Sequence, residues 1–468
     1  MNMLRTTVYL AFCGLLLVGC SHQSVSPAPG MMSLTQFNAR RLDNADLKKF
    51  MWDAGALHEG ESLPAWWGFK SLYWAALYYN PSLAEARAQI EAAKAVEVTA
   101  GQSPNPTITL APGRDTTTTP AAWLLDVGFS IPIETNGKRE LRKAIALAQT
   151  LSAQSQLVSK AWDVRSAVLN SLLDYDIASE TLKRTETLEK TQAAITAEYN
   201  ERLSQGQLPT ANASQAQISY QQSHLQLEQA RTDLKQAEVK LAGAIGVPLT
   251  ALEAVHIGDK VPPVNEALLL DKKLRRAALA SHPLLVGALA DYRAAHEALQ
   301  LEVAKRVPDI DLGPGYEWNS VQGEKITLGI TLILPIMNDN EGPIAEATAK
   351  RLQAARHFDT LQAAVINSIE QATILRHSAR RELAAAKEIV DLQHTKQTRL
   401  ESMIQRNQAG TLPLLYAESE VQTAQVSELV AKAKLLKASA ALEDALRMPL
   451  FGPVIGTELL SLEHEGAN

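Results

Sequence analysis

The chain has 468 residues, of which 46% are hydrophobic and 21% are charged, a composition ordinary for a folded protein. Its formal net charge is −6, and no basic stripe of the kind that nucleic-acid binding needs is present, so that class of function is excluded. Only 5% of the residues are aromatic whereas alanine is frequent, which favours long helices that pack closely.

A secretory signal is predicted over residues 1–19. Arg5 precedes an apolar run from Val8 to Val18 that is too short to span a bilayer as a stable helix. The run ends in the letters LVGC, which resemble the cleavage site of bacterial lipoproteins and so imply cleavage before Cys20 and acylation of its side chain. The alternative is an ordinary signal peptide with a chance cysteine. Because Cys13 would leave with the signal, the mature chain would form no internal disulfide.

Two repeats are predicted in the mature chain, at 80–247 and 281–448. Corresponding prolines lie at nearly constant separations, 202 residues for Pro81 and Pro283 and 203 for Pro132 and Pro335. Such self-similarity is the signature of a duplicated architecture. Three segments outside the repeats, 20–79, 248–280 and 449–468, are expected to form an N-terminal tail and an equatorial region.

Each repeat is expected to open with a helix, from Ser82 to about Gln102 in the first, and to continue with a β-hairpin at 106–132 or 308–335. The stretches WLLDVGFSI and KITLGITLIL alternate apolar and polar residues, which is typical of strands with one apolar and one polar face. Turn-rich stretches separate the paired strands. The apolar face includes Val127, Phe129, Leu328 and Ile330, and the polar face includes Asp126, Ser130, Thr327 and Thr331.

A very long helix follows each hairpin. Lys138 to Leu203 and Ile344 to Asn407 contain no glycine or proline, and a helix of that length extends roughly 100 Å. Each is expected to return through a second helix, over Thr210 to Ala242 and Leu414 to Arg447. The sequence Gly-x-Leu-Pro stands at both reversals, so Gly206 and Gly410 are predicted to end the first helices in the left-handed conformation, and Pro209 and Pro413 to begin the second.

Four amphipathic strands cannot close a barrel, and an open sheet edge is not tolerated in lipid. Three copies would supply 3 × 4 = 12 strands, enough to enclose an aqueous lumen. The polar faces would then line this lumen and the apolar faces would meet lipid. The helices would continue the lumen as a tube through the periplasm.

The chain resembles TolC-type outer-membrane efflux proteins across essentially all of its mature sequence. The stretches that carry the resemblance are NPSLAEARAQIEAA, SIPIETNGKRELRKAIA, LPIMNDNEGPIAEATAKR and the two glycine-centred turns. It implies a homotrimer with a β-barrel in the outer membrane of a Gram-negative bacterium and a helical barrel below, docked to a periplasmic adaptor and an inner-membrane pump. The segment around Gly137 and the second stretch after Pro335 are most similar to the CzcC-like branch, which serves heavy-metal pumps of the resistance-nodulation-division class.

The predicted fold is therefore mainly α with a small membrane β portion, a long coiled-coil barrel plus a β-barrel with four strands per chain, two internal repeats and three subunits. The predicted function is the exit duct of a tripartite efflux system for heavy-metal cations. Alternatives are the same duct for organic compounds, and, in another class, a periplasmic adaptor lipoprotein. No catalytic motif, cofactor motif or metal-ligand spacing is present, so no enzyme activity is expected.

Both helical turns are expected to dock to the adaptor, through Leu208 and Leu412 beside Gly206, Pro209, Gly410 and Pro413. In TolC, aspartates six and nine positions after the second turn glycine narrow the pore. Those positions hold Tyr416 and Ser419 here, so that gate does not carry over. Glu418 and Glu420 lie close by as possible pore-tip acids.

Overall fold

A computed structural model describes residues 33–58, 61–117, 119–258, 261–266 and 272–452. The predicted signal, Cys20 and the C-terminal tail lie outside the described residues. The chain divides into two units, Met1–Arg40 and Arg41–Asn468. In the first unit, helix α2 (Leu34–Asn38) begins at Ser33, whose side chain and that of Gln36 cap each other's backbone N–H groups.

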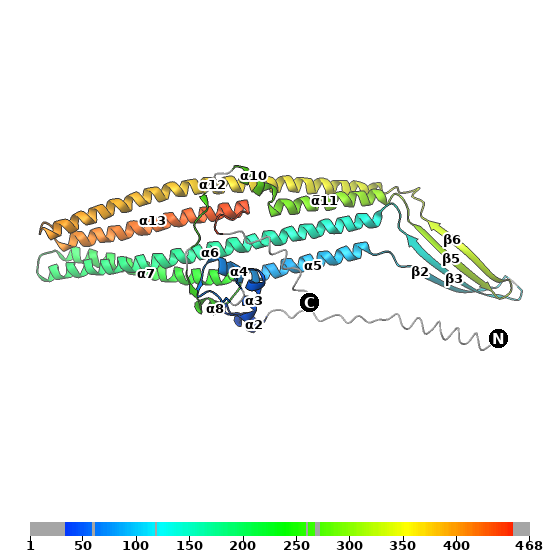
Figure 1. Cartoon of the computed structure of the whole chain (residues 1–468), viewed down its shortest axis with the longest axis horizontal. Helices are drawn as coiled ribbons and strands as arrows, with labels where there is room; N and C mark the ends of the chain where they lie inside the picture. Colours follow the sequence, from blue (N-terminus) through cyan, green and yellow to red (C-terminus); the bar gives the residue numbers. More distant parts are fainter. Residues whose placement is uncertain (1–32, 59–60, 118, 259–260, 267–271, 453–468) are drawn as a thin grey trace. The chain divides into compact units, whose positions relative to one another are not determined.

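Six helices and four strands form most of the second unit, in an order that occurs twice. Each half has a helix, two strands, a very long helix and a 36-residue helix (Figure 1). The first half comprises α5 (Pro81–Gly101), β2 (Thr107–Asp115), β3 (Ala122–Ile133), α6 (Lys138–Ser204) and α7 (Thr210–Ile245). The second half comprises α11 (Pro283–Ala304), β5 (Ile310–Asn319), β6 (Gly323–Leu332), α12 (Glu341–Gln405) and α13 (Thr411–Leu446).

The helices pack as a layer in which α6 contacts α5, α7, α11 and α13, and α12 contacts α11 and α13. Helices α5 and α7 therefore lie on one edge of the layer and α12 lies on the other. Both long helices run without interruption, α6 for 67 residues and α12 for 65. Helix α12 begins three residues before the predicted Ile344 and includes Pro343, because proline is tolerated in a first turn, where its missing N–H has no partner to lose.

All four strands join one antiparallel sheet in the order β2-β3-β5-β6. The pairing of β3 with β5 unites the two predicted hairpins, and β2 and β6 remain as edges. Strand β6 ends at Leu332, short of the predicted boundary at 335, since Pro335 has no N–H to donate to a ladder. Gly313 of β5 lies very close to the backbone of β3. A Cβ atom at this position would lie 1.5 Å from the Phe129 carbonyl oxygen, so only glycine can be accommodated here.

Short elements pack beside the middle of the long helices. They are α3 (Ala45–Asp53), β1 (Trp66–Trp67), α4 (Phe69–Tyr79), α8 (Leu249–Glu253), β4 (His256–Ile257) and α10 (Lys272–Ala280). Strand β1 pairs in parallel with β4, which brings two of the predicted equatorial segments together. The core at this level includes Leu47, Leu72 and Leu77 with Leu169 and Leu172 of α6, all fully buried. Within the described residues, every helix is too short or too polar to cross a membrane.

Candidate functional site

The strand register separates the predicted face residues of the sheet into two groups. Asp126 lies opposite Glu317, and Glu317 lies opposite Lys325, with Lys325 Nζ 3.4 Å from Glu317 Oε2. Ser130 and Thr327 lie on this same polar face, as does Thr331 opposite Asp311. Residues Val127, Phe129, Leu328 and Ile330 lie on the opposite face. The sheet therefore has one charged, hydroxyl-rich face, and Glu317, which was not among the predicted polar-face residues, belongs to it.

The other face of the sheet exposes large apolar side chains. Ile326 is 80% exposed, Leu328 71% and Ile330 63%. At the end of the sheet remote from the helices, Trp123 is exposed and the Arg114 guanidinium lies 5.2 Å from its ring centroid. A contiguous exposed apolar surface of this kind marks a contact with lipid or protein.

The junction between β3 and α6 is held by charge pairs. Glu134 receives hydrogen bonds from Arg142 and from Arg139 Nε, the latter at 3.1 Å. The hydrogen bond from Arg142 is the main reason that the pKa of Glu134 lies below its ordinary value. Arg139 and Arg142, which follow Gly137 in the first turns of α6, are therefore both paired with the acid at the end of β3.

The same junction reaches across to β5. Lys138 Nζ donates to Asp309 Oδ1 at 2.7 Å and to the Val307 carbonyl at 2.6 Å, while Thr135 N donates to Asp309 at 2.9 Å. Burial raises the pKa of Asp309, but Lys138 and Thr135 outweigh it, so the net pKa is lowered. These contacts join the end of β3 and the start of β5 to the first turn of α6.

Two asparagines in the left-handed conformation turn the chain from strand to helix. Asn136 has φ 55° and its side chain donates to the Ala304 carbonyl at 3.1 Å; Asn340 has φ 59° and donates to the Glu302 carbonyl at 2.6 Å. Asparagine tolerates positive φ better than most residues. Each side chain thereby ties the start of a long helix to the end of α11.

The two helical turns at the tips differ, and the prediction for Gly410 is wrong. Gly206 has φ 70° after α6, and Pro209 is the N-cap of α7, as expected. In the second turn Asn407 has φ 54°, whereas Gly410 has φ −86° and is the N-cap of α13. Asparagine substitutes for glycine in the left-handed position, so the matching letters Gly-x-Leu-Pro lie three residues out of structural register. Pro413 consequently lies inside the first turn of α13 rather than before it.

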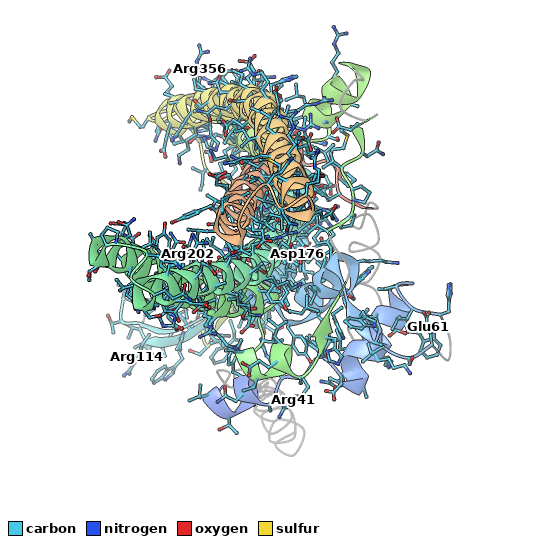
Figure 2. The ribbon with its side chains drawn as sticks, turned by 90° about the vertical axis from the view of Figure 1, so that its left-hand side faces the viewer. Arg41, Glu61, Arg114, Asp176, Arg202 and Arg356 are labelled. Atoms are coloured by element: carbon cyan, nitrogen blue, oxygen red, sulfur yellow. The ribbon has the colours of Figure 1, made fainter. Side chains whose placement is uncertain are left out.

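The tips are joined by polar contacts between α6 and α13. Tyr416 Oη donates to Tyr199 Oη at 3.1 Å, and Gln192 Nε2 donates to Ser419 Oγ at 2.8 Å. Burial and then Tyr199 raise the pKa of Tyr416 to about 12, so its hydroxyl stays protonated at physiological pH. Figure 2 faces this end of the hairpins, with Arg202 labelled near the end of α6.

The predicted tip residues are not equally accessible. Leu208 and Leu412 are both half-buried, and Gly206, Pro209 and Gly410 are exposed. Of the two acids, Glu420 is ion-paired with Lys396 of α12, while Glu418 is half-buried and forms no ion pair with another described residue. Tyr199 and Gln192 were not among the predicted site residues. Both lie on α6 and link the first hairpin to the second through α13.

A buried ion pair lies where the equatorial core meets the long helices. Arg165 of α6, 2% exposed, donates from Nε to Glu443 of α13 at 2.8 Å. Glu443 also accepts the backbone N–H groups of Leu450 at 2.6 Å and Phe451 at 2.7 Å. The Arg165 guanidinium lies 4.9 Å from the Phe69 ring centroid. This cluster fastens the chain after α13 to α4 and α6, and removing one charge would leave the other buried without a partner.

The described chain thus joins a sheet with one polar and one apolar face to two long helical hairpins. The family model "Outer membrane efflux protein" matches residues 72–247 and 274–446. The chain belongs to the outer membrane efflux protein family. No curated protein sequence matches it significantly.

Solved structures share the fold at low sequence identity. A membrane protein from Pseudomonas aeruginosa has TM-score 0.68 at 18% identity, covering 81% of this chain and 93% of its own. The outer membrane protein VceC from Vibrio cholerae has TM-score 0.66 at 15% identity, covering 82% of this chain and 96% of its own. The CmeC outer membrane channel from Campylobacter jejuni has TM-score 0.67 at 12% identity, covering 95% of this chain and 94% of its own.

Proposed function

We propose that the chain forms the outer-membrane exit duct of a tripartite efflux system. In this proposal an inner-membrane pump of the resistance-nodulation-division class delivers substrates, a periplasmic adaptor links the pump to the duct, and the duct crosses the outer membrane. The observation that carries the proposal is the two-faced sheet, which sets Asp126 beside Glu317 on one side and exposes Leu328 and Ile330 on the other. The first, polar face suits the aqueous lumen of a barrel, and the second, apolar face suits contact with lipid.

The duct is a ring of three copies. Strands β2 and β6 are unpaired edges of a four-stranded sheet, and in lipid each must pair with another copy. Three copies supply 3 × 4 = 12 strands, which leaves an aqueous lumen lined by the polar face. Leu328, Ile330, Val127 and Phe129 then face lipid.

The edges of the helical layer support the same ring. Helix α12 exposes Ile374 (68%) and Leu392 (64%), and α7 on the other edge exposes Leu225 (72%). Apolar surface on both edges suits side-by-side packing in which α12 of one copy meets α5 and α7 of the next. Such a head-to-tail contact closes into a ring if the rotation between copies allows it.

The two halves of the chain are an internal duplication, and each contributes one tip for adaptor docking. Leu208 lies just before the N-cap of α7 and Leu412 lies in the first turn of α13, and both offer half-buried apolar contacts to an adaptor. Glu418, free of an ion pair with any described residue, is the stronger of the two candidate pore-tip acids, since Glu420 is neutralised by Lys396. Acylation of Cys20 anchors the mature chain to the outer membrane.

The exported substrate is a heavy-metal cation in this proposal, on the basis of the CzcC-like stretches after Gly137 and Pro335. The described residues contain no cluster of three histidine, cysteine or acidic side chains placed to hold a metal ion, so the duct wall would pass cations without coordinating them. Export of organic compounds by the same duct is the second candidate. A periplasmic adaptor lipoprotein is disfavoured because the exposed apolar face of the sheet suits contact with lipid rather than with the aqueous periplasm.

Aspartate at both tip leucines tests the docking role. The double variant Leu208→Asp, Leu412→Asp keeps Gly206 and Asn407, so both turns should form and the trimer should assemble. Charge at an apolar contact should abolish crosslinking to the adaptor and export of the metal or drug that the wild type removes. The matched control Gln207→Asp, Gln408→Asp adds the same charge to polar turn positions and should export normally.

Normal export and crosslinking by the leucine variant would show that the tips are turns only. Failure of export with intact crosslinking would place the defect outside docking. Planar-bilayer conductance of the purified variant, which needs no adaptor, should equal that of the wild type and reports separately on the duct itself.

A further inference from the structure

A groove of about 650 Å³ runs between α6 and α11. Its size lies within the range of small-molecule sites in proteins. Leu151 and Val158 of α6 and Val286 and Leu289 of α11 form an apolar floor, and Leu289 is 58% exposed. From Pro283 to His296 the groove follows α11 for roughly 20 Å, a length comparable to an extended fatty acyl chain.

One end of the groove is cationic. Arg293 and His296 of α11 line it at the end nearer the strands, and no acidic side chain lines it anywhere. Among the described residues no partner forms a hydrogen bond or ion pair with the Arg293 guanidinium. The His296 Nδ1 atom is buried without a hydrogen-bond partner among the described residues.

Two other grooves differ from the first because acidic side chains line them. The groove of about 280 Å³ beside α7 includes Asp174 and Asp233, and that of about 410 Å³ beside α12 includes Asp444. The first of these also includes Lys240 and Lys437, and the second includes Arg447, so acids and cations stand together in both. Of these three grooves, the one between α6 and α11 combines an apolar floor with a cation that has no carboxylate partner among the described residues.

A neighbouring copy would not fill this groove in the proposed ring. Helices α6 and α11 lie next to each other in the centre of the layer, whereas copies would meet at α5, α7 and α12. With respect to the described residues of the ring, the groove is therefore open to a small molecule on one face of the layer.

We propose that this groove binds a free, single-chain anionic amphiphile, of which a long-chain carboxylate is the simplest example. The chain lies on Leu151, Val286 and Leu289, and the carboxylate accepts hydrogen bonds from the Arg293 guanidinium. Charge-assisted hydrogen bonds of this kind are about twice as strong as neutral ones, so the head group sets the specificity and the apolar floor adds affinity. This site is independent of the exported substrate and of adaptor docking.

The test uses the full-length protein in phosphatidylcholine nanodiscs and palmitate carrying a photoreactive diazirine. Crosslinks should map by mass spectrometry to residues 151–158 and 283–296, and unlabelled palmitate should compete. Arg293→Gln should weaken palmitate binding about tenfold, whereas Arg293→Lys should retain most of it. Arg356→Gln, on α12, is the control and should bind as the wild type does (Figure 2).

Hexadecanol separates the head group from the chain. It should bind about tenfold more weakly than palmitate to the wild type and equally to wild type and Arg293→Gln. Equal binding of alcohol and carboxylate, unchanged binding by Arg293→Gln, or crosslinks confined to other helices would overturn the proposal. Competition from phosphatidylglycerol in the nanodisc would also overturn it, because the groove would then take bilayer lipid. Since binding is measured on purified protein, loss of export in any variant leaves this result unaffected.

Discussion

Asn80 and His282 precede the prolines that start α5 and α11, yet they cap those helices differently. Asn80 donates to the Ala244 carbonyl at 3.0 Å and accepts from Ser82 N at 3.0 Å. His282 is 3% exposed, makes no side-chain cap and leaves Nδ1 without a partner. Burial, and then the charge of Arg447, lower the pKa of His282 to about 4. The start of α11 therefore lacks the side-chain cap that α5 has, and the hydrogen bond of the His282 ring is made with the backbone of Ala445 instead.

We expect His282→Asn to stabilise the protein and to reduce its sensitivity to acid. Above the ordinary pKa of 6.5 both the folded and unfolded states hold a neutral His282. As the pH falls from there to about 4, the unfolded state takes up a proton that the folded state does not, so stability is lost, and below that range the loss stops. The variant should unfold at a higher temperature at pH 7, by a cap worth about 1 kcal/mol, and should lose less between pH 7 and pH 4.5. An equal loss in both proteins would contradict this account of His282.

Asp126 and Glu317 should make the duct selective for cations. They lie opposite each other on the polar face, with one lysine, Lys325, beside them, so every copy adds net negative charge to the lumen. Rings of acids favour cations in pores. The double variant Asp126→Asn, Glu317→Gln should lower the ratio of potassium to chloride permeability in planar bilayers. Glu324→Gln, on the apolar face of β6, is the control. An unchanged ratio in the double variant would mean that these acids do not face the ion path.

At the scale of the elements, the tips test which residue holds the left-handed turn. Gly206→Ser places a side chain at φ 70° and should destabilise its turn by about 1 kcal/mol. Gly410→Ser changes an extended N-cap position, where serine is a preferred residue and where a Cβ would lie in ordinary contact with the Arg202 guanidinium at 3.9 Å, so it should be neutral or slightly stabilising. Hydrogen exchange at the two tips measures both. Equal destabilisation by the two substitutions would contradict the extended conformation of Gly410 and would indicate a left-handed one.

The periodicity of the sequence predicted the type of each large element, because long runs with helical spacing and short alternating runs are both clear signals. The predicted helix boundaries were wrong at two places. Asn407 takes the left-handed position that was expected of glycine, and Pro343 is accommodated in the first turn of α12. Ion pairs such as Lys138 with Asp309 and Arg165 with Glu443 join residues 171 and 278 positions apart. Nothing in the local pattern pairs such residues, so only the folded chain shows them.

At the scale of the whole molecule, the proposed duct requires a sheet with one face in water and the other face in lipid. Family membership is shown by the sequence match, whereas the ring, the lumen and the membrane contact are proposals that rest on the unpaired edges of β2 and β6 and on the two faces of the sheet. A ring gives every polar-face residue the same aqueous surroundings and every apolar-face residue the same lipid surroundings. That alternation is a property of the assembly and can be measured in living cells.

Single cysteines placed along β3 and β6 measure it most directly. Both native cysteines lie within the first 20 residues, and Cys20 is acylated in this proposal, so an introduced thiol is the only reactive one. A water-soluble maleimide added to intact cells should label cysteine at Asp126, Ser130, Thr327 or Thr331. It should not label cysteine at Val127, Phe129, Leu328 or Ile330, where lipid excludes it. Labelling that alternates in this way is the result we predict; equal labelling on both faces would contradict an outer-membrane duct built from this sheet.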